Sequence, residues 1–150
     1  MGGFAFLSRQ TKDKFSQIYF YNLREKKIKK ITIQKANIRD FKWSPDREAI
    51  AFLMAKPLTS AERERLAKGD DAQVIDQDYR HIHLWIFPLR DRKARLLTSQ
   101  EEKVWSFNWS PDSRKIAMLA SPLPTAEGHE YRSKLVLVDL KGGQEKVLTE

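Results

Sequence analysis

Short apolar or aromatic stretches recur along the chain and are separated by polar connectors rich in turn residues. The clearest stretches are Phe4–Leu7, Ile18–Tyr21, Ile50–Phe52, His83–Phe87 and Leu135–Val138. β-Branched and aromatic residues favour strands, whereas Pro, Gly, Ser and Asp favour turns. No stretch approaches the roughly eighteen consecutive apolar residues that a membrane helix requires. The pattern therefore predicts an all-β protein of short antiparallel strands.

One sequence motif occurs twice, 66 positions apart. The first copy contains Trp43, Ser44, Pro45 and Asp46 after Phe41, and the second contains Trp109, Ser110, Pro111 and Asp112 after Phe107. Four residues after each Asp comes Ile-Ala, then an apolar stretch, and finally a closing Leu-Thr at 97–98 and 148–149. The chain's beginning matches the same template without its first part. The sequence thus predicts three-quarters of a unit followed by two full units, at about 3–33, 38–98 and 104–149.

Each unit is predicted to be a meander of four antiparallel strands. Within the repeated motif, proline presets φ at the second turn position, and Ser and Asp side chains bond nearby backbone amides. A meander of this size buries its faces only by stacking on neighbours, as the blades of a β-propeller do. We expect Trp43 and Trp109 to fill the gaps between adjacent blades, because a repeated position usually serves repeated packing.

About two and three-quarter blades cannot close a ring, for which four are about the minimum. We therefore expect residues 1–150 to be a single partial β-propeller domain and a segment of a longer protein. The alternative is a fragment whose exposed blade faces and strand edges require a partner.

An insertion at about 56–82 interrupts the first full unit. Thr59 and Glu62 form the pattern of a capping box, residues 61–68 are good helix formers, and Gly69 is placed to end a helix. One short helix is therefore predicted in the insertion. A long insertion can be functional or can simply cover a blade edge, and we favour the cover.

Charge and metal-ligating residues do not indicate a second function. The 28 lysines and arginines against 20 aspartates and glutamates give a net charge of +8, but the cations are spread along the chain. The densest group, 24–30, alternates around Ile28 as strand residues do, so no nucleic-acid partner is expected. His81 and His83 lie two apart without a third ligand at a fixed spacing, and the aspartates of the insertion lack the spacing of a calcium loop. We expect no metal and no cofactor.

The sequence also lacks the patterns of a hydrolytic site. It contains no Gly-x-Ser-x-Gly elbow, no phosphate-binding glycine loop and no His-Glu-x-x-His. We therefore assign no catalytic residue to this chain. The first residues carry no basic region followed by an apolar stretch, so a cytoplasmic location without membrane association is expected.

The units resemble the WD40-like propeller repeats of TolB-like proteins and of the prolyl oligopeptidase family of serine peptidases. That family's pattern is Trp-Ser-Pro-Asp-Gly, then Ile-Ala-Phe, a strand with Leu-Trp, and a closing Leu-Thr. Here Arg47 and Ser113 replace the glycine, which predicts a turn without a positive φ. The insertion, with 54–57, the charged helix and 74–79 ahead of Leu84-Trp85, is similar to acylaminoacyl-peptidase and dipeptidyl-peptidase-like members.

The resemblance implies a non-catalytic propeller that restricts peptide access to an α/β-hydrolase domain absent from this chain. Its partners would be that domain, further blades and the peptide substrate of the parent enzyme. Glu101 and Glu102 lie without the motif that surrounds the family's amino-terminus-binding glutamates, so that role is not transferred. Two alternatives stay open: a TolB-like module that binds a protein or peptide, and a truncated fragment without independent activity.

Overall fold

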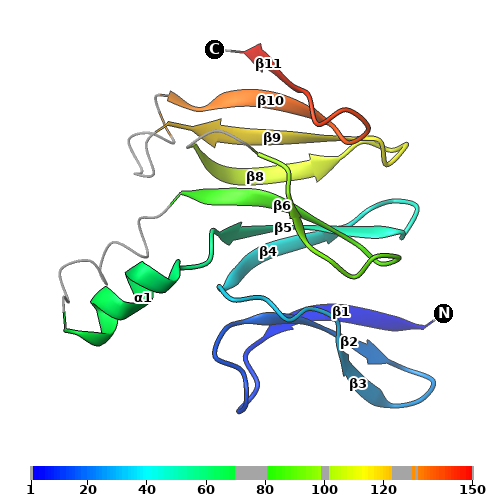
Figure 1. Ribbon diagram of the computed structural model, residues 1–150. Coiled ribbons are helices and arrows are strands. Elements are labelled where there is room, and N and C mark those ends of the chain that lie inside the picture. Colours follow the sequence, from blue (N-terminus) through cyan, green and yellow to red (C-terminus); the bar gives the residue numbers. More distant parts are fainter. Residues whose placement is uncertain (1, 70–80, 99–101, 123–129, 131, 150) are drawn as a thin grey trace.

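Three antiparallel sheets make up the protein. The computed structural model describes residues 2–69, 81–98, 102–122, 130 and 132–149 (Figure 1). Sheet 1 contains β1 (Gly3–Ser8), β2 (Gln17–Asn22) and β3 (Lys27–Lys30) in that order. Sheet 2 contains β4 (Ile38–Trp43), β5 (Ala49–Ala55), β6 (Ile82–Pro88) and β7 (Arg95–Leu96). Sheet 3 contains β8 (Lys103–Trp109), β9 (Lys115–Ser121), β10 (Lys134–Asp139) and β11 (Glu145–Thr149).

Sequential strands pair with one another in every sheet, so each sheet is a meander. The predicted fold class, with one three-stranded and two four-stranded units, is confirmed. Figure 1 shows the sheets stacked face to face, with sheet 2 between the other two. The β4–β5, β6–β7, β8–β9 and β10–β11 turns lie at one end of the stack, and α1 (Ser60–Ala67) lies at the opposite end.

The core consists of two layers, one between each pair of adjacent sheets. Strand β5 contributes to both because its side chains alternate between its two faces. Ile50, Phe52 and Met54 pack with Ile18 of sheet 1, whereas Ala51 and Leu53 belong to the layer shared with sheet 3. This alternation explains why five consecutive residues of β5, from 50 to 54, are all buried.

A closing threonine has the same contact in all three units. Its hydroxyl oxygen accepts a hydrogen bond from a backbone N–H of the third strand of the repeat, which is β2, β6 or β10. The pairs are Ile18–Thr32 at 3.0 Å, Leu84–Thr98 at 3.3 Å and Leu135–Thr149 at 3.4 Å. The third strand and the closing segment are thereby joined where regular pairing ends. The repeated Leu-Thr of the sequence has this structural cause.

Helix α1 begins and ends as its sequence predicts. Thr59 Oγ1 accepts the Glu62 N–H at 3.3 Å, and the Glu62 carboxylate accepts the Thr59 N–H at 2.7 Å, which completes the capping box. Gly69 follows with φ of +80°, a conformation that glycine adopts without strain. The rest of the insertion, 70–80, lies outside the described residues. No helix in the described part of the chain is long and apolar enough to cross a membrane.

Strand β3 is the outer edge of sheet 1, and all four of its residues are exposed. The alternation around Ile28 predicts one buried face, but Ile28 is 57% exposed. This difference arises because Ile28 lies opposite Tyr21, on the face of sheet 1 directed away from sheet 2. The lysines of β3 keep the edge solvated.

Candidate functional site: the Trp-Ser-Pro-Asp turns and the contacts between sheets

The first repeated motif forms a tight turn between β4 and β5. The Arg47 N–H donates to the Ser44 carbonyl at 2.9 Å, which places Pro45 and Asp46 at the two central positions. The Asp46 carboxylate accepts the Ser44 hydroxyl at 2.5 Å and the Glu48 N–H at 3.0 Å. Pro45 thus occupies the turn position where its fixed φ is favourable.

The Ser44 hydroxyl oxygen also accepts the Ala49 N–H at 3.0 Å, and Ser44 is 2% exposed. The second turn repeats these contacts, since Asp112 accepts the Ser110 hydroxyl at 2.5 Å and the Arg114 N–H at 3.0 Å. The Ser110 oxygen accepts the Lys115 N–H at 3.0 Å. Both serine hydroxyls are therefore committed to turn geometry and are not presented as nucleophiles.

These hydrogen bonds favour the charged form of each aspartate. The Ser44 hydroxyl, followed by the Glu48 N–H, holds the pKa of Asp46 below its usual 3.8. The Ser110 hydroxyl and the Arg114 N–H lower the pKa of Asp112 in the same way. The ionised form of each carboxylate therefore stabilises the folded turn.

Stability should accordingly fall in acid. A carboxyl group whose pKa is lower in the folded state than in the unfolded chain stabilises the native state above pH 3.8. This contribution is lost as the pH falls through the pKa of the folded state. We expect Asp46→Asn to flatten the decline of the unfolding free energy below pH 3.8, and Asp46→Asn with Asp112→Asn to flatten it further. Urea denaturation across this acid range measures the slope. Equal slopes in wild type and the double variant would contradict this role.

The residue after each turn aspartate has a positive φ, so the prediction of a turn without one was wrong. Arg47 has φ of 62° and Ser113 has φ of 60°. Left-handed backbone costs a non-glycine residue roughly 1–2 kcal/mol. The hydrogen bonds within each turn hold the backbone there despite this cost. Arg47 and Ser113 thus hold a conformation that only glycine adopts without strain.

We expect Arg47→Gly to raise the free energy of unfolding by about 0.5–1 kcal/mol, because relief of left-handed strain exceeds glycine's added chain entropy. Ser113→Gly should raise the free energy of unfolding by less than Arg47→Gly does, or lower it. The reason is that glycine removes the Ser113 hydroxyl oxygen, which accepts the Asp46 N–H at 3.0 Å. Chemical denaturation of both variants against wild type is the measurement. If Arg47→Gly destabilises as much as Ser113→Gly, strain at position 47 is not relieved by glycine.

The structure places each repeated tryptophan in a layer between sheets. Trp43 packs against the cluster shared by sheets 1 and 2, and Trp109 against the cluster shared by sheets 2 and 3. Both rings are half-buried. Their positions are therefore equivalent in packing as well as in sequence.

Sheets 2 and 3 are further joined by hydrogen bonds between their first strands. The Trp109 indole Nε1–H donates to the Lys42 carbonyl at 3.1 Å. Lys42 Nζ donates in turn to the Phe107 carbonyl at 2.8 Å and to Asn108 Oδ1 at 2.6 Å. Sequence reasoning did not find this contact, although Lys42 and Asn108 are 66 positions apart and hence repeat-equivalent.

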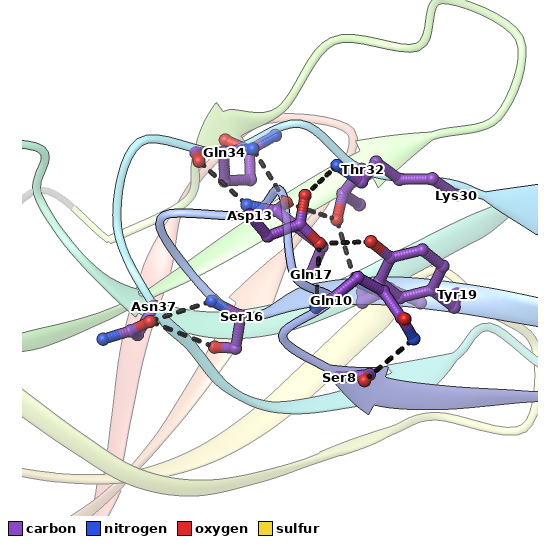
Figure 2. Close-up of polar contacts among 11 residues, drawn as sticks. Ser8, Gln10, Asp13, Ser16, Gln17, Tyr19, Lys30, Thr32, Gln34 and Asn37 are labelled. Atoms are coloured by element: carbon purple, nitrogen blue, oxygen red, sulfur yellow. Dashed lines mark hydrogen bonds and ion pairs between the residues drawn. The ribbon is translucent and has the colours of Figure 1, made fainter.

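A polar cluster on the β1–β2 loop was also missed (Figure 2). Asp13 accepts hydrogen bonds from Tyr19 and Lys30. The bond from Lys30, followed by that from Tyr19, lowers the pKa of Asp13. Burial and then Asp13 raise the pKa of Tyr19, and Asp13 raises that of Lys30. These contacts favour the charged forms of Asp13 and Lys30 and the protonated form of Tyr19.

A second network in Figure 2 is buried between sheet 1 and the chain that leads to β4. The Gln17 side-chain oxygen accepts from the Thr32 hydroxyl at 3.0 Å and from the Gln34 N–H at 2.8 Å. The Gln17 amide nitrogen donates to the Gln34 carbonyl at 2.9 Å. Such satisfied networks define the position of a segment more sharply than apolar contacts do.

The remaining sequence candidates have separate structural contacts. His81 Nε2 lies 3.2 Å from the Pro122 carbonyl, whereas His83 is buried with Nδ1 3.3 Å from Thr98 Oγ1. Within the described residues, no three metal-ligating side chains come together. Glu102 forms an ion pair with Lys134 of β10 at 2.6 Å, and Glu101 lies outside the described residues.

An open groove of about 590 Å³ lies where the turns of sheet 2 meet sheet 3. It is lined by Ser44, Trp109 and Ser113 together with three arginines and three acidic residues: Arg47, Arg90, Arg95, Asp46, Glu48 and Asp91. Among the described residues that line it, none is a histidine; the Ser44 hydroxyl donates to Asp46 within the turn, and the Ser113 hydroxyl oxygen accepts the Asp46 N–H at 3.0 Å.

Neither a known protein family nor a curated protein matches the sequence. Among solved structures, TolB from Acinetobacter baumannii matches 98% of this chain with a TM-score of 0.62 at 16% identity. A putative TolB from Agrobacterium tumefaciens matches 97% with a TM-score of 0.63 at 14% identity. The chain has the β-propeller fold. Porphyromonas gingivalis dipeptidyl peptidase 4 matches 98% of the propeller chain with a TM-score of 0.64 at 15% identity.

This propeller chain spans only part of each similar protein. It covers 29% of the Acinetobacter TolB, 44% of the Agrobacterium protein and 17% of the dipeptidyl peptidase. At these identities the likeness concerns the fold. The three sheets accordingly resemble blades of these β-propellers.

Proposed function

We propose that this chain is the non-catalytic propeller portion of a longer serine peptidase, in which the complete propeller restricts peptide access to a hydrolase domain. The observation that supports this most is the partial stack itself. Sheet 3 has an outer face of four partly exposed apolar residues that are paired side by side on β9 and β10: Ala117, Leu119, Leu135 and Leu137. Such a face is typical of a surface that another blade covers.

The other end of the stack carries an aromatic face. Phe4 lies opposite Tyr21 and Phe6 opposite Tyr19, with ring centroids 5.5 and 5.9 Å apart. Phe4 is 54% exposed. The inner faces of the same sheets are buried by neighbouring blades, so both outer faces are suited to continue the stack.

The role at the peptidase rests on the resemblance of the repeats and on the likeness to a dipeptidyl peptidase structure, of which this chain spans a small part. A closed ring of blades above an active site admits short extended peptides and excludes folded proteins by size. Catalysis would belong wholly to the other domain, since the turn serines of this chain are committed to backbone hydrogen bonds.

Peptide hydrolysis by the native full-length product tests this proposal. We expect cleavage of short peptide substrates, no cleavage of folded proteins, and loss of activity after treatment with diisopropyl fluorophosphate. A catalytically inactive product, or cleavage that persists after serine modification, would overturn the peptidase role.

A TolB-like binding module is the second candidate, because two TolB structures match with nearly the same TM-scores as the peptidase. In that case the full-length product contains no hydrolase domain and retains a protein or peptide partner. Mass spectrometry of the native product and of proteins co-purified with it distinguishes the two functions.

A further inference from the structure

The groove where the turns of sheet 2 meet sheet 3 is lined by two non-glycine residues with left-handed backbone. Arg47 ends the β4–β5 turn with φ of 62°, and Ser113 ends the β8–β9 turn with φ of 60°. Such strain persists only where the surrounding structure holds it, and strained residues gather at ligand-binding sites. Glycine would fit both positions without strain, but it would remove a guanidinium and a hydroxyl from the groove.

The walls of this groove are joined to one another by hydrogen bonds. The Asp46 N–H donates to Ser113 Oγ at 3.0 Å, which links the first turns of sheets 2 and 3. The Leu89 N–H donates to the Glu48 carbonyl at 3.0 Å, which links the β6–β7 hairpin to the β4–β5 turn. The groove is therefore formed before a ligand binds, and this lowers the cost of ordering its residues on binding.

Three arginines of the groove have no counterion within the described residues. Arg47, Arg90 and Arg95 are exposed, and their guanidinium groups make no hydrogen bond or ion pair with any described residue. A guanidinium can donate two parallel hydrogen bonds to a carboxylate or a phosphate. The groove thus offers fixed donors for an anionic group.

The acidic residues of the groove limit how much negative charge a ligand can carry. Asp46 is engaged by the Ser44 hydroxyl and the Glu48 N–H. The exposed carboxylates of Glu48 and Asp91 make no hydrogen bond or ion pair with the described residues, so they keep their full charge beside the arginines. A polyphosphate or a nucleic-acid strand would be repelled by them. A ligand with a single carboxylate satisfies the arginines without that repulsion.

Apolar side chains complete the lining. Ile86 is buried, whereas Trp109 and Leu140 are half-buried. The Trp109 indole N–H is already donated to the Lys42 carbonyl, so its ring offers an apolar surface. The groove volume of about 590 Å³ lies within the roughly 300–1,000 Å³ of small-ligand sites. The lining therefore suits a short ligand that carries one carboxylate next to an apolar group.

We propose that this groove binds the carboxyl end of a short peptide whose last residue is apolar. The terminal carboxylate accepts hydrogen bonds from the Arg47 guanidinium, and the last side chain contacts Trp109 and Leu140. A chain end fits better than an internal acidic residue because it carries a carboxylate and an apolar side chain on one Cα. The inference goes beyond the proposed function, since this chain's own residues form the site and no hydrolase domain is required.

The tripeptide Ala-Ala-Phe with both ends free is the probe, titrated into the ¹⁵N-labelled 150-residue protein. We expect saturable binding of one peptide per chain, with shifts of the Trp109 indole and Ser113 amide signals. Ala-Ala-Phe amide lacks the terminal carboxylate, and Ala-Ala-Gly lacks the apolar side chain. Each should bind about tenfold more weakly.

Two arginine variants separate this site from general attraction to a basic protein. Arg47→Gly removes the guanidinium and relieves the backbone strain, so this variant should fold and yet bind Ala-Ala-Phe about tenfold more weakly. Arg92→Gly is the matched control, because Arg92 is exposed on the β6–β7 hairpin with φ of 52° and is not among the described residues that line the groove. It should leave the affinity unchanged. Thermal unfolding followed by circular dichroism verifies that both variants are folded.

Absence of saturable binding, equal binding of the amide, or equal affinities of Arg47→Gly and Arg92→Gly would overturn the proposal. So would equal binding of acetyl-Ala-Asp-Phe amide, because a side-chain carboxylate would then suffice. Tighter binding of inorganic phosphate than of Ala-Ala-Phe would also contradict it. Peptide hydrolysis by the full-length product is measured separately, so a failed titration refutes only this groove and leaves the proposed function to its own test.

Discussion

Replacing Phe52 by alanine is expected to lower the free energy of unfolding by about 3–5 kcal/mol. The Phe52 side chain is fully buried in the layer between sheets 1 and 2, and its ring stacks on Trp85 with centroids 6.5 Å apart. Truncation removes apolar contacts and leaves a cavity that sheets on both sides cannot easily close. Urea denaturation followed by far-UV circular dichroism is the measurement.

Phe4→Ala is the matched control because Phe4 is 54% exposed on the outer face of sheet 1. Its expected cost is below about 1 kcal/mol, arising from edge contacts with the rings of Phe6 and Tyr21. Similar losses in the two variants would mean that sheet 1 does not pack on sheet 2 as described.

Replacing Thr32 by valine is expected to cost about 2–3 kcal/mol. The substitution preserves shape but removes the hydroxyl that accepts the Ile18 N–H and donates to the Gln17 side chain. Thr32 and Ile18 are both fully buried, so water cannot replace the lost partner. Hydrogen exchange should show the Ile18 amide among the most accelerated, together with a lower denaturation midpoint.

Thr149→Val serves as the comparison, since the Thr149 hydroxyl makes the equivalent contact with Leu135 but is exposed to solvent. Its expected cost is within about 0.5 kcal/mol. A loss at Thr149 as large as that at Thr32 would show that burial does not determine the value of this contact.

The strands and the helix could be predicted from local pattern. All strands except the two-residue β7 carry β-branched or aromatic residues, and the Thr59–Glu62 capping box marks a helix start that depends only on neighbours in sequence. The repeat added what a single unit lacks, because equivalent positions such as Trp43 and Trp109 imply equivalent packing. The order of strands within each sheet followed from that equivalence.

The contacts between sheets could not be predicted in the same way. Lys42 meets Asn108 and Trp109 only once the sheets are stacked, and nothing in the local sequence of Lys42 indicates an ammonium that bridges two blades. The left-handed residue at Arg47 was missed because the local preference of arginine opposes it. Hydrogen bonds made by Ser44 and Asp46 outweigh that preference, and their combined effect is visible only in the folded turn.

The intact mass of the native product tests the central claim most directly, that these blades form a segment of a larger propeller protein. An antibody raised against this segment identifies the product in cell extract under denaturing conditions. We predict a single polypeptide well above 17.6 kDa, the mass of the 150 residues. A native product of 17.6 kDa would contradict the claim, because the open faces would then belong to the complete chain.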